Sequence, residues 1–320
     1  MGRQLSANPP RGSFGGAVIA GAHDGDPSRL LATEPVLGMV RESTYFYATL
    51  RDESGTLYPV MRRRSDPAAW PTRLWLRAAS STAGLDRFEL PQRSAAAASV
   101  IATAGGDGVR FTAEAHNGDE PLACLVTATD LTWEEGSILH LGGRDISPGL
   151  QWHLPDVDGS MLYTSRLFVV KGHVAGTPVR GIAGVDDVHL SPGRRNYVDD
   201  PITRHHLSTA WCTWATCYDD GTAESGHVAF GPGRFGFAIR STSEGDIAIG
   251  RRIDGDVTHA DGLPAHATFD IDDTPWDFTI DPFGRCAPAG GPVLQAEGLF
   301  QRRGETRHAT TWSASLEVPA

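Results

Sequence analysis

The sequence predicts an all-β protein made of two successive antiparallel β-barrels or sandwiches. Runs rich in β-branched and aromatic residues recur at intervals of roughly 8–12 residues, with turn residues between them. The chain contains 37 glycines and 21 prolines, and few of its segments place apolar residues at helical spacing. The strand pattern pauses once, at a polar connector over residues 194–203, and then resumes.

Hairpins are expected in the first part of the chain. A strand over Val36–Leu50 reverses at Asp52–Gly55 into a strand over Leu57–Arg62, because Gly55 supplies the positive φ of a tight turn. The only basic triplet, Arg62–Arg64, is expected to be a solvated strand end. Further strands are predicted over Thr72–Ala78, Ser99–Thr103, Val109–Ala115 and Leu122–Thr127.

The region Asp130–Pro155 is less regular. Tryptophan and histidine residues stand there among glycines and prolines, which indicates a long loop or a plug. Loops of this length inside a domain are usually functional or mobile.

The stretch Tyr163–Gly193 carries the most unusual chemistry. It predicts three strands separated by turns, the first ending at Gly172 and the second interrupted at Ala175–Thr177. The acidic pair Asp186-Asp187 then follows a glycine-spaced apolar run. Two carboxylates and a histidine directly after such a run indicate a functional site.

The second part of the chain repeats the strand and turn pattern after the connector Arg194–Thr203. We therefore expect a flexible N-terminus over residues 1–13, an N-terminal β-domain over 14–198 and a C-terminal β-domain over 199–320. The predicted strands are Leu207–Tyr218, His227–Phe230, Phe235–Ser241, Ile247–Ile253, Ala267–Ile271, Trp276–Asp281, Leu294–Arg302 and His308–Val318.

Composition excludes several function classes. The formal net charge of -11 leaves no basic surplus for nucleic acid or an anionic membrane. No run of about 18 apolar residues predicts a transmembrane helix, and the N-terminus lacks the apolar core of a secretory signal. A soluble, cytoplasmic protein is expected, with free thiols at its four cysteines, Cys124, Cys212, Cys217 and Cys286.

Asp186 and Asp187 are the candidate catalytic acids. Neighbouring residues of a strand point to opposite faces, so at most one of the two lies inside an apolar barrel. Burial disfavours the charged form of a carboxyl and raises its pKa, which would make it a general acid near neutral pH. The alternative is that the pair caps a turn by accepting backbone N–H groups.

Two histidines are further catalytic candidates. His189 shares a face with Asp187 if the strand continues, and His153 stands beside Trp152 and would exchange protons in an apolar pocket. The alternatives are a surface position for His189 and ordinary core packing for Trp152 and His153.

The second part contributes the candidate binding residues His206, Trp211 and Trp214. Trp211 and Trp214 are expected on opposite faces of a strand, so that one closes a pocket between the barrels or fills the second core. The alternation from His206 through Cys212 to Trp214 would form one face. Adjacent histidines without a partner motif do not have zinc-ligand spacing, so no metal site is expected. The sequence has no nucleophile elbow, P-loop or dinucleotide fingerprint.

The pattern from Tyr163 to Asp186 resembles the lipocalin-like carotenoid hydratase (hydroxyneurosporene synthase) superfamily, which includes related pericyclic cyclases. Gly181, Ala183 and Asp186 match the signature G-x-A-W-M-D-H, whereas Gly184, Val185 and Asp187 stand where the family has Trp, Met and His. The hairpin over 44–62 and the run 281–285 resemble the same superfamily. The resemblance implies two tandem calycin-type barrels.

The resemblance also implies a cofactor-independent lyase or isomerase acting on a hydrophobic isoprenoid- or polyketide-like molecule. An interior carboxylic acid would drive hydration, dehydration, isomerisation or cyclisation. The residues expected to contact the substrate are Trp152, Tyr163, Tyr45, Tyr47, His206, Trp211 and Trp214. Two alternatives stay open: a non-catalytic lipophile-binding protein, and a carbohydrate-active β-sandwich with a carboxylate pair across a groove.

Overall fold

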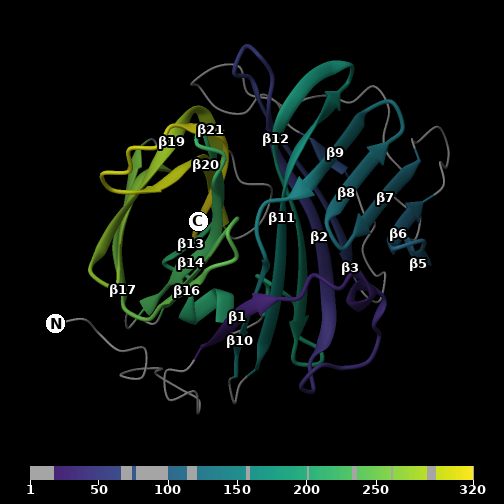
Figure 1. Cartoon of the computed structure of the whole chain (residues 1–320). Coiled ribbons are helices and arrows are strands. Elements are labelled where there is room, and N and C mark those ends of the chain that lie inside the picture. Colours follow the sequence, from purple (N-terminus) through teal and green to yellow (C-terminus); the bar gives the residue numbers. More distant parts are fainter. Residues whose placement is uncertain are drawn as a thin grey trace.

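Two antiparallel sheets, one forming a half-barrel and the other a nearly closed barrel, make up the computed structural model (Figure 1). It describes residues 18–65, 74–76, 100–113, 121–155, 159–199, 202–232, 236–260, 262–286 and 293–319. The predicted all-β fold class is confirmed. The expected N-terminal segment 1–13 lies outside the described residues.

Over the described residues, the first sheet has twelve strands and forms the half-barrel. Strand β1 pairs with β10, and β10 pairs with β11, at a branch from the main path. The main path runs β4 (Leu74–Leu76), β3 (Leu57–Ser65), β2 (Val40–Arg51), β12 (Thr177–Leu190), β11 (Met161–Val174), β9 (Leu139–Asp145), β8 (Asp130–Glu135), β7 (Leu122–Thr127), β6 (Gly108–Ala113) and β5 (Ile101–Gly105), and the branch holds β10 (Gly149–Leu154) and β1 (Ile19–His23). A short 3-10 helix, η2 (Pro27–Leu31), follows β1.

Strands β11 and β12 form one long hairpin, which corrects the prediction of three strands over Tyr163–Gly193. The chain turns once, at Ala175 (φ 48°) and Gly176 (φ 82°). The predicted strand end at Gly172 is wrong, because this glycine lies within the ladder between β9 and β12. A Cβ atom there would lie 1.8 Å from the carbonyl oxygen of His140, so glycine permits the approach of β9.

The predicted loop or plug over Asp130–Pro155 is wrong as well. This region forms strands β8, β9 and β10. Gly136 has φ 52° in the turn between β8 and β9. Gly143 lies inside a strand and lets β11 approach, since a Cβ atom there would be 2.1 Å from the Val169 oxygen. A close strand contact therefore explains Gly143, whereas Gly136 serves the tight turn between two strands.

The second sheet has nine strands in the part of the chain that the structure describes. The predicted single strand over Ile247–Ile253 is two strands, because pairing stops at Gly250 and resumes at Ile253. The order is β16 (Ile247–Gly250), β15 (Gly236–Thr242), β14 (Ala223–Phe230), β13 (Ala210–Tyr218), β21 (Ala309–Pro319), β20 (Val293–Arg302), β19 (Thr274–Cys286), β18 (Leu263–Ile271) and β17 (Ile253–Ala260). A π-helical turn, η3 (Ile202–His206), precedes β13.

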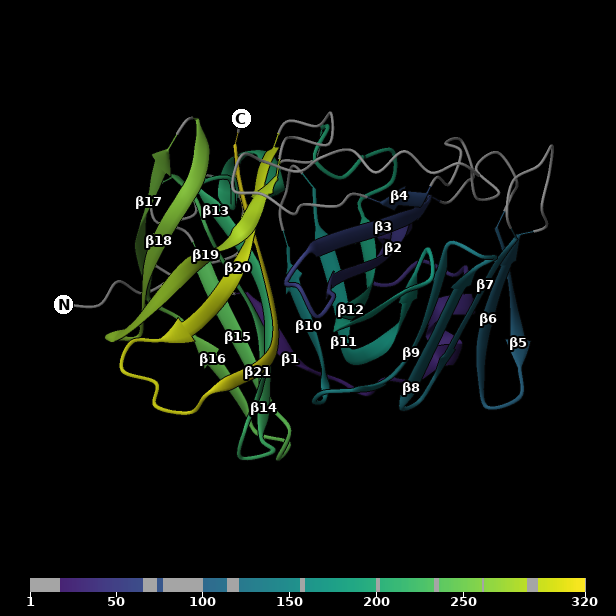
Figure 2. The same cartoon turned by 90° about the horizontal axis from the view of Figure 1, so that it is seen from above.

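The two sheets pack against each other along β10–β12 and β2 of the first sheet and β13–β15, β20 and β21 of the second, as Figures 1 and 2 show from two directions. Every residue from 181 to 190 is buried. Side chains alternate along a strand, so Ala183 and Val185 enter the half-barrel core, while Ile182 and Val188 pack with residues of the second sheet. Strand β12 is therefore buried on both faces.

The half-barrel core contains a buried ion pair, which corrects the expectation that Arg62–Arg64 is a solvated strand end. Arg62 is 1% exposed, and its Nε and Nη2 donate to the two carboxylate oxygens of Glu135 at 2.7 and 2.5 Å. The indole Nε1 of Trp133 donates to the same carboxylate at 2.9 Å. Pairing in this geometry offsets the cost of burying both charges.

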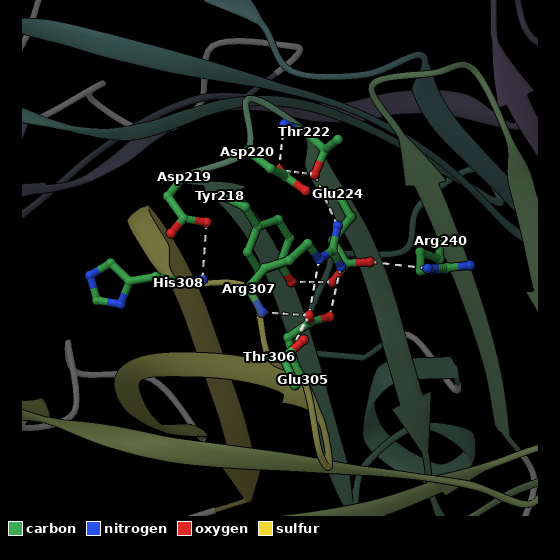
Figure 3. A network of polar contacts seen from close by, with 10 residues as sticks. All are labelled: Tyr218, Asp219, Asp220, Thr222, Glu224, Arg240, Glu305, Thr306, Arg307 and His308. Carbon is green, nitrogen blue, oxygen red and sulfur yellow. Dashed lines mark hydrogen bonds and ion pairs between the residues drawn. The ribbon is translucent and has the colours of Figure 1, made fainter.

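A second polar network fastens one end of the second sheet (Figure 3). The Arg307 guanidinium lies 3.8 Å from the ring centroid of Tyr218 and donates to Glu305 and Thr222. The Tyr218 hydroxyl donates to Glu224 at 2.5 Å, and Arg240 donates to the same carboxylate at 3.0 Å. These contacts join the β13–β14 turn to the segment between β20 and β21.

The described residues contain no helix long and apolar enough to cross a membrane. Cys124 and Cys212 are buried free thiols and Cys217 is a half-buried one, in agreement with the prediction for these residues. The side chain of Cys286 lies outside the described part of the chain.

Candidate active site between the two sheets

Asp186 is a buried carboxyl held by tyrosine hydroxyl groups. It lies on β12 and is 3% exposed. The Tyr163 hydroxyl donates to its Oδ2 at 2.5 Å, and the Tyr47 hydroxyl donates to its Oδ1 at 3.4 Å. Over the described ranges, no ion pair joins a basic side chain to this carboxyl.

The pKa of Asp186 is raised to about 7. The main cause is burial, and the hydroxyl groups of Ser165, Tyr163 and Tyr47 act in the opposite direction by favouring the charged form. The pKa values of both tyrosines are raised well above their ordinary value, first by burial and then by the neighbouring Asp186 charge. The group therefore exchanges its proton near neutral pH, while the tyrosines remain hydrogen-bond donors.

Gly184 makes room for Tyr47. The two residues are cross-strand partners on β12 and β2. A Cβ atom on residue 184 would lie 2.2 Å from Cζ and 2.4 Å from the hydroxyl oxygen of Tyr47. The phenol ring therefore crosses β12 directly over the missing side chain, which lets it reach Asp186 two residues further along the strand.

Aromatic residues from both sheets surround Tyr163. The ring of Trp152 on β10 stacks on Tyr163 with centroids 5.1 Å apart and an interplanar angle of 4°. Trp211 on β13 contacts both rings at 5.3 Å. Phe237 on β15 lies 4.9 Å from Trp152. The structure thus brings together five of the predicted residues, Asp186, Tyr163, Trp152, Trp211 and Tyr47.

Tyr45 lies further along β2, with its side chain on the same face as that of Tyr47. Its ring packs against the aromatic residues between the sheets, and its hydroxyl accepts from the Asn196 amide at 3.4 Å. Tyr45 is the cross-strand partner of Asp186 on β12, but its hydroxyl is hydrogen-bonded to Asn196 and not to Asp186.

His227 on β14 is a site residue that the sequence reasoning missed. It is 0% exposed, and its ring centroid lies 5.6 Å from that of Tyr163. Its Nδ1 is 3.0 Å from Thr213 Oγ1. Thr213 Oγ1 in turn accepts a hydrogen bond from Trp211 Nε1 at 3.1 Å. Burial lowers the pKa of His227 to about 3, so the ring is neutral. A histidine inside an apolar strand was the available signal.

Glu297 on β20 is a second missed acid. It is 1% exposed and accepts from Thr49 of β2 at 3.0 Å and from Gln295 at 2.9 Å. Burial raises its pKa to about 7, and the bonds from Thr49 and Ser315 and the charge of Arg51 oppose the rise. The signal in the sequence was one charge within the otherwise uncharged run Val293–Phe300.

Further polar contacts join the sheets on either side of these acids. Arg51 donates to Asp281 at 3.0 Å and to the Trp312 carbonyl at 2.7 Å. Asp281 is therefore a buried residue that is ion-paired with Arg51. Tyr197 donates to Glu317 at 2.7 Å, and its backbone has φ 61°, an uncommon value for a tyrosine.

Asp187 and His189 lie on the opposite face of β12, as alternation predicts for neighbouring aspartates. Arg41 Nε donates to both carboxylate oxygens of Asp187 at 2.9 Å, and Thr44 donates at 2.7 Å. His189 Nε2 lies 3.9 Å from the same carboxylate, and burial lowers the pKa of this histidine. Both residues are buried, so the alternative of a surface position for His189 is wrong.

Three predicted site residues lie apart from Asp186. His153 is half-buried on the face of β10 opposite Trp152. Trp214 packs inside the second sheet, 5.7 Å from Trp276 and 4.8 Å from Phe300. His206 belongs to η3, so the predicted single face from His206 to Trp214 is wrong: the strand begins only at Ala210.

Within the described part of the chain, no group of three or more His, Cys, Asp or Glu residues is arranged to hold a metal ion. Proton transfer and hydrogen bonding are the chemistry that the side chains at Asp186 offer by themselves.

No model of a known protein family matches the chain, and no curated protein is significantly similar in sequence. Solved structures are similar at low identity. A candidate AttH protein from Nitrosomonas europaea is 15% identical with a TM-score of 0.48, covering 87% of this chain and 92% of its own. Kievitone hydratase from Nectria haematococca is 8% identical with a TM-score of 0.44, covering 97% and 95%. CghA in complex with Sch210972 is 13% identical with a TM-score of 0.47, covering 94% and 98%.

Proposed function

We propose that the protein is a cofactor-independent enzyme that moves a proton on a hydrophobic, isoprenoid- or polyketide-like small molecule bound between the two sheets. Asp186 is its acid and base. The observation that carries the proposal is a nearly inaccessible carboxyl, bound by two tyrosine hydroxyl groups and surrounded by aromatic rings.

A pKa of about 7 suits Asp186 to both halves of a proton transfer. Both protonation states are populated near neutral pH, and a general acid or base works best when its pKa lies near the working pH. Tyr163 orients the carboxyl through a hydrogen bond of 2.5 Å and stabilises the carboxylate after the proton has left. The proton goes to an alkene carbon, an enol or a departing hydroxyl group.

The aromatic residues supply the remaining needs of such a reaction. The ring centroids of Trp152, Tyr163 and Trp211 lie 5.1 to 5.3 Å apart, with the first two rings stacked and Trp211 tilted against both. Aromatic faces attract cations, so these rings stabilise positive charge that develops when an alkene is protonated. Hydration or dehydration, isomerisation and cyclisation are the reaction types that this combination supports, as the sequence resemblance also implies.

A non-catalytic lipophile-binding protein is the second candidate. A protein of this kind needs an apolar binding surface, and it does not need a titratable group within that surface. The position of Asp186 on the face of β12 that carries Ile182 and Val188 favours catalysis, because burying a carboxyl without a cation costs free energy that binding alone does not require. The carbohydrate-active alternative predicts exposed tryptophans, whereas Trp152, Trp211 and Trp214 are buried.

Deuterium incorporation tests the proposal. The protein is incubated in D2O with geraniol, linalool and β-ionone, and deuterium on carbon is followed by mass spectrometry. We expect incorporation into at least one of them by the wild type and a loss of about 100-fold or more in Asp186→Asn. Tyr45→Phe is the matched control, because its hydroxyl contacts Asn196 and not Asp186. An unchanged rate in Asp186→Asn would show that Asp186 is not the acid.

A further inference from the structure

We propose that His227 presents its Nε2–H to a carbonyl oxygen of the substrate, so that the ligand of this site is a ketone or enone and not a hydrocarbon. This inference rests on the proposed function and narrows its substrate class. It starts from a chain of hydrogen bonds in the second sheet that leads from Trp211 through Thr213 to His227.

The chain determines which nitrogen of His227 carries the hydrogen. The indole N–H of Trp211 only donates, so Thr213 Oγ1 accepts from it. Thr213 has a single hydroxyl proton, and its other neighbour is His227 Nδ1 at 3.0 Å. If Nδ1 carried the hydrogen, the Thr213 proton would need a further acceptor, and no other acceptor lies within hydrogen-bond distance of Thr213 Oγ1 among the described residues. Nδ1 therefore accepts, and the neutral ring carries its hydrogen on Nε2.

The resulting Nε2–H has no hydrogen-bond partner within the described ranges, although the His227 side chain is fully buried. A buried donor without an acceptor is unfavourable, because it has lost its hydrogen bond to water and gained none in the protein. Its surroundings are aromatic: the ring meets Tyr163 at an interplanar angle of 70° and Trp211 at 80°. Trp211 carries no acceptor oxygen, and the Tyr163 hydroxyl, which donates to Asp186, makes no hydrogen bond to His227 Nε2.

Tyr163 links this donor to the acid. Its hydroxyl is 2.5 Å from Asp186 Oδ2, and its ring centroid is 5.6 Å from that of His227. Tyr163 is therefore next to both groups: the Asp186 carboxyl, which exchanges a proton, lies at its hydroxyl, and the neutral His227 ring, which donates a hydrogen bond, lies beside its ring. This pair suits a carbonyl compound, in which the proton moves at carbon while charge develops on oxygen.

The reaction step balances without any added reagent. The Asp186 carboxylate removes a proton from the carbon next to the carbonyl, and the electron pair moves into a new C–C double bond while the carbonyl π bond opens toward oxygen. The enolate oxygen is held by the His227 Nε2–H. The protonated Asp186 then returns the proton to a carbon of the same conjugated system, which gives an isomer.

Binding of small ketones tests the inference separately from turnover. The quenching of tryptophan fluorescence is titrated with β-ionone and 2-cyclohexenone, and with the hydrocarbons in which a methylene group replaces each carbonyl. We expect the wild type to bind at least one ketone about tenfold more tightly than its hydrocarbon, which corresponds to one ordinary hydrogen bond. The carbonyl infrared band of the bound ketone is expected to shift to lower frequency.

Variants decide the assignment. His227→Phe is expected to bind ketone and hydrocarbon equally and to lose the infrared shift, and His227→Gln, which keeps an N–H near the same place, is expected to restore both. Thr213→Val tests the positioning residue: 15N NMR is expected to show loss of the Nε2–H tautomer together with a reduced ketone preference. Equal binding of ketone and hydrocarbon by the wild type, or binding of neither, overturns the inference.

The acid variant separates the two proposals. Asp186→Asn is expected to keep the ketone preference and the infrared shift while it loses deuterium incorporation. If the ketone preference is absent but Asp186-dependent incorporation persists, His227 is not the carbonyl donor and the proposed function stands. If the preference is present but incorporation does not depend on Asp186, the proposed function fails and the binding assignment stands.

Discussion

The ring of Tyr47 occupies the space where a side chain on Gly184 would be: a Cβ atom at position 184 would lie 2.2 Å from Cζ of the phenol. Tyr47 needs this path to place its hydroxyl 3.4 Å from Asp186. A residue without a side chain thus decides how the acid is hydrogen-bonded.

Gly184→Ala is expected to displace the Tyr47 ring and to remove one hydrogen bond from Asp186. Deuterium incorporation should fall about tenfold, as in Tyr47→Phe, because one ordinary hydrogen bond is worth about 1 kcal/mol. Gly142→Ala on β9 is the matched control, since nothing lies within 4 Å of its added Cβ atom. An alanine at 184 that leaves the rate unchanged would show that Tyr47 does not support the acid.

Tyr163→Phe is expected to shift the pH–rate profile to higher pH. The Tyr163 hydroxyl favours the charged form of Asp186 and so lowers the pKa of that carboxyl. Removing the hydroxyl raises the pKa of Asp186 above about 7. The part of the pH–rate profile that follows the loss of the Asp186 proton therefore moves to higher pH. The midpoint of deuterium incorporation against pH measures the shift. Tyr45→Phe should keep the wild-type midpoint, and a downward shift in Tyr163→Phe would contradict the assignment.

Glu297→Gln is expected to stabilise the fold increasingly as pH rises. The pKa of Glu297 is about 7 in the folded chain and near its ordinary value when unfolded, so between roughly pH 4 and 7 the folded state binds more protons. The free energy of unfolding of the wild type therefore loses the contribution of Glu297 as pH rises through this window, whereas that of Glu297→Gln does not change for this reason. Urea unfolding at several pH values should show a difference that grows to roughly 3 kcal/mol.

Glu305→Gln supplies the control of opposite sign. The pKa of Glu305 is lowered to about 2, chiefly by the hydrogen bond from Arg307. Its carboxylate stabilises the folded state above the unfolded pKa, and this contribution is lost as pH falls toward 2. The glutamine variant should be less stable than the wild type near pH 7 and equally stable in acid. The same pH trend in both variants would contradict the assigned pKa directions.

Asp187→Asn is expected to distinguish the role of Asp187 from that of its neighbour Asp186. Removing this carboxylate leaves Arg41 buried without its counter-charge, and breaking a buried pair costs about 3–5 kcal/mol. Thermal and urea unfolding should therefore show strong destabilisation, while the deuterium incorporation per folded molecule stays near that of the wild type. The reverse result, a stable fold without activity, would move the catalytic role to Asp187.

The sequence by itself determined the all-β class, most strands and the separation of Asp186 from Asp187, because strand periodicity of two is a local property. It also located Trp211 and Trp214 on opposite faces of one strand, which the structure confirms. Prediction failed where glycine was read as a turn: Gly143 and Gly172 lie inside strands because another strand's carbonyl approaches them closely. Local sequence does not show which backbone will lie beside a glycine.

Only the tertiary structure decided which residues meet Asp186. Tyr47 and Tyr163 bond to it from strands β2 and β11, and His227 on β14 packs against Tyr163 because the two sheets pack face to face. The same packing buries Glu297 against Thr49, 248 positions away in the chain. Burial, and with it a carboxyl pKa near 7, depends on both sheets at once. The sequence of one strand was therefore enough to identify Asp186 as a candidate acid, whereas its hydrogen-bond partners and its burial could be known only from the whole fold.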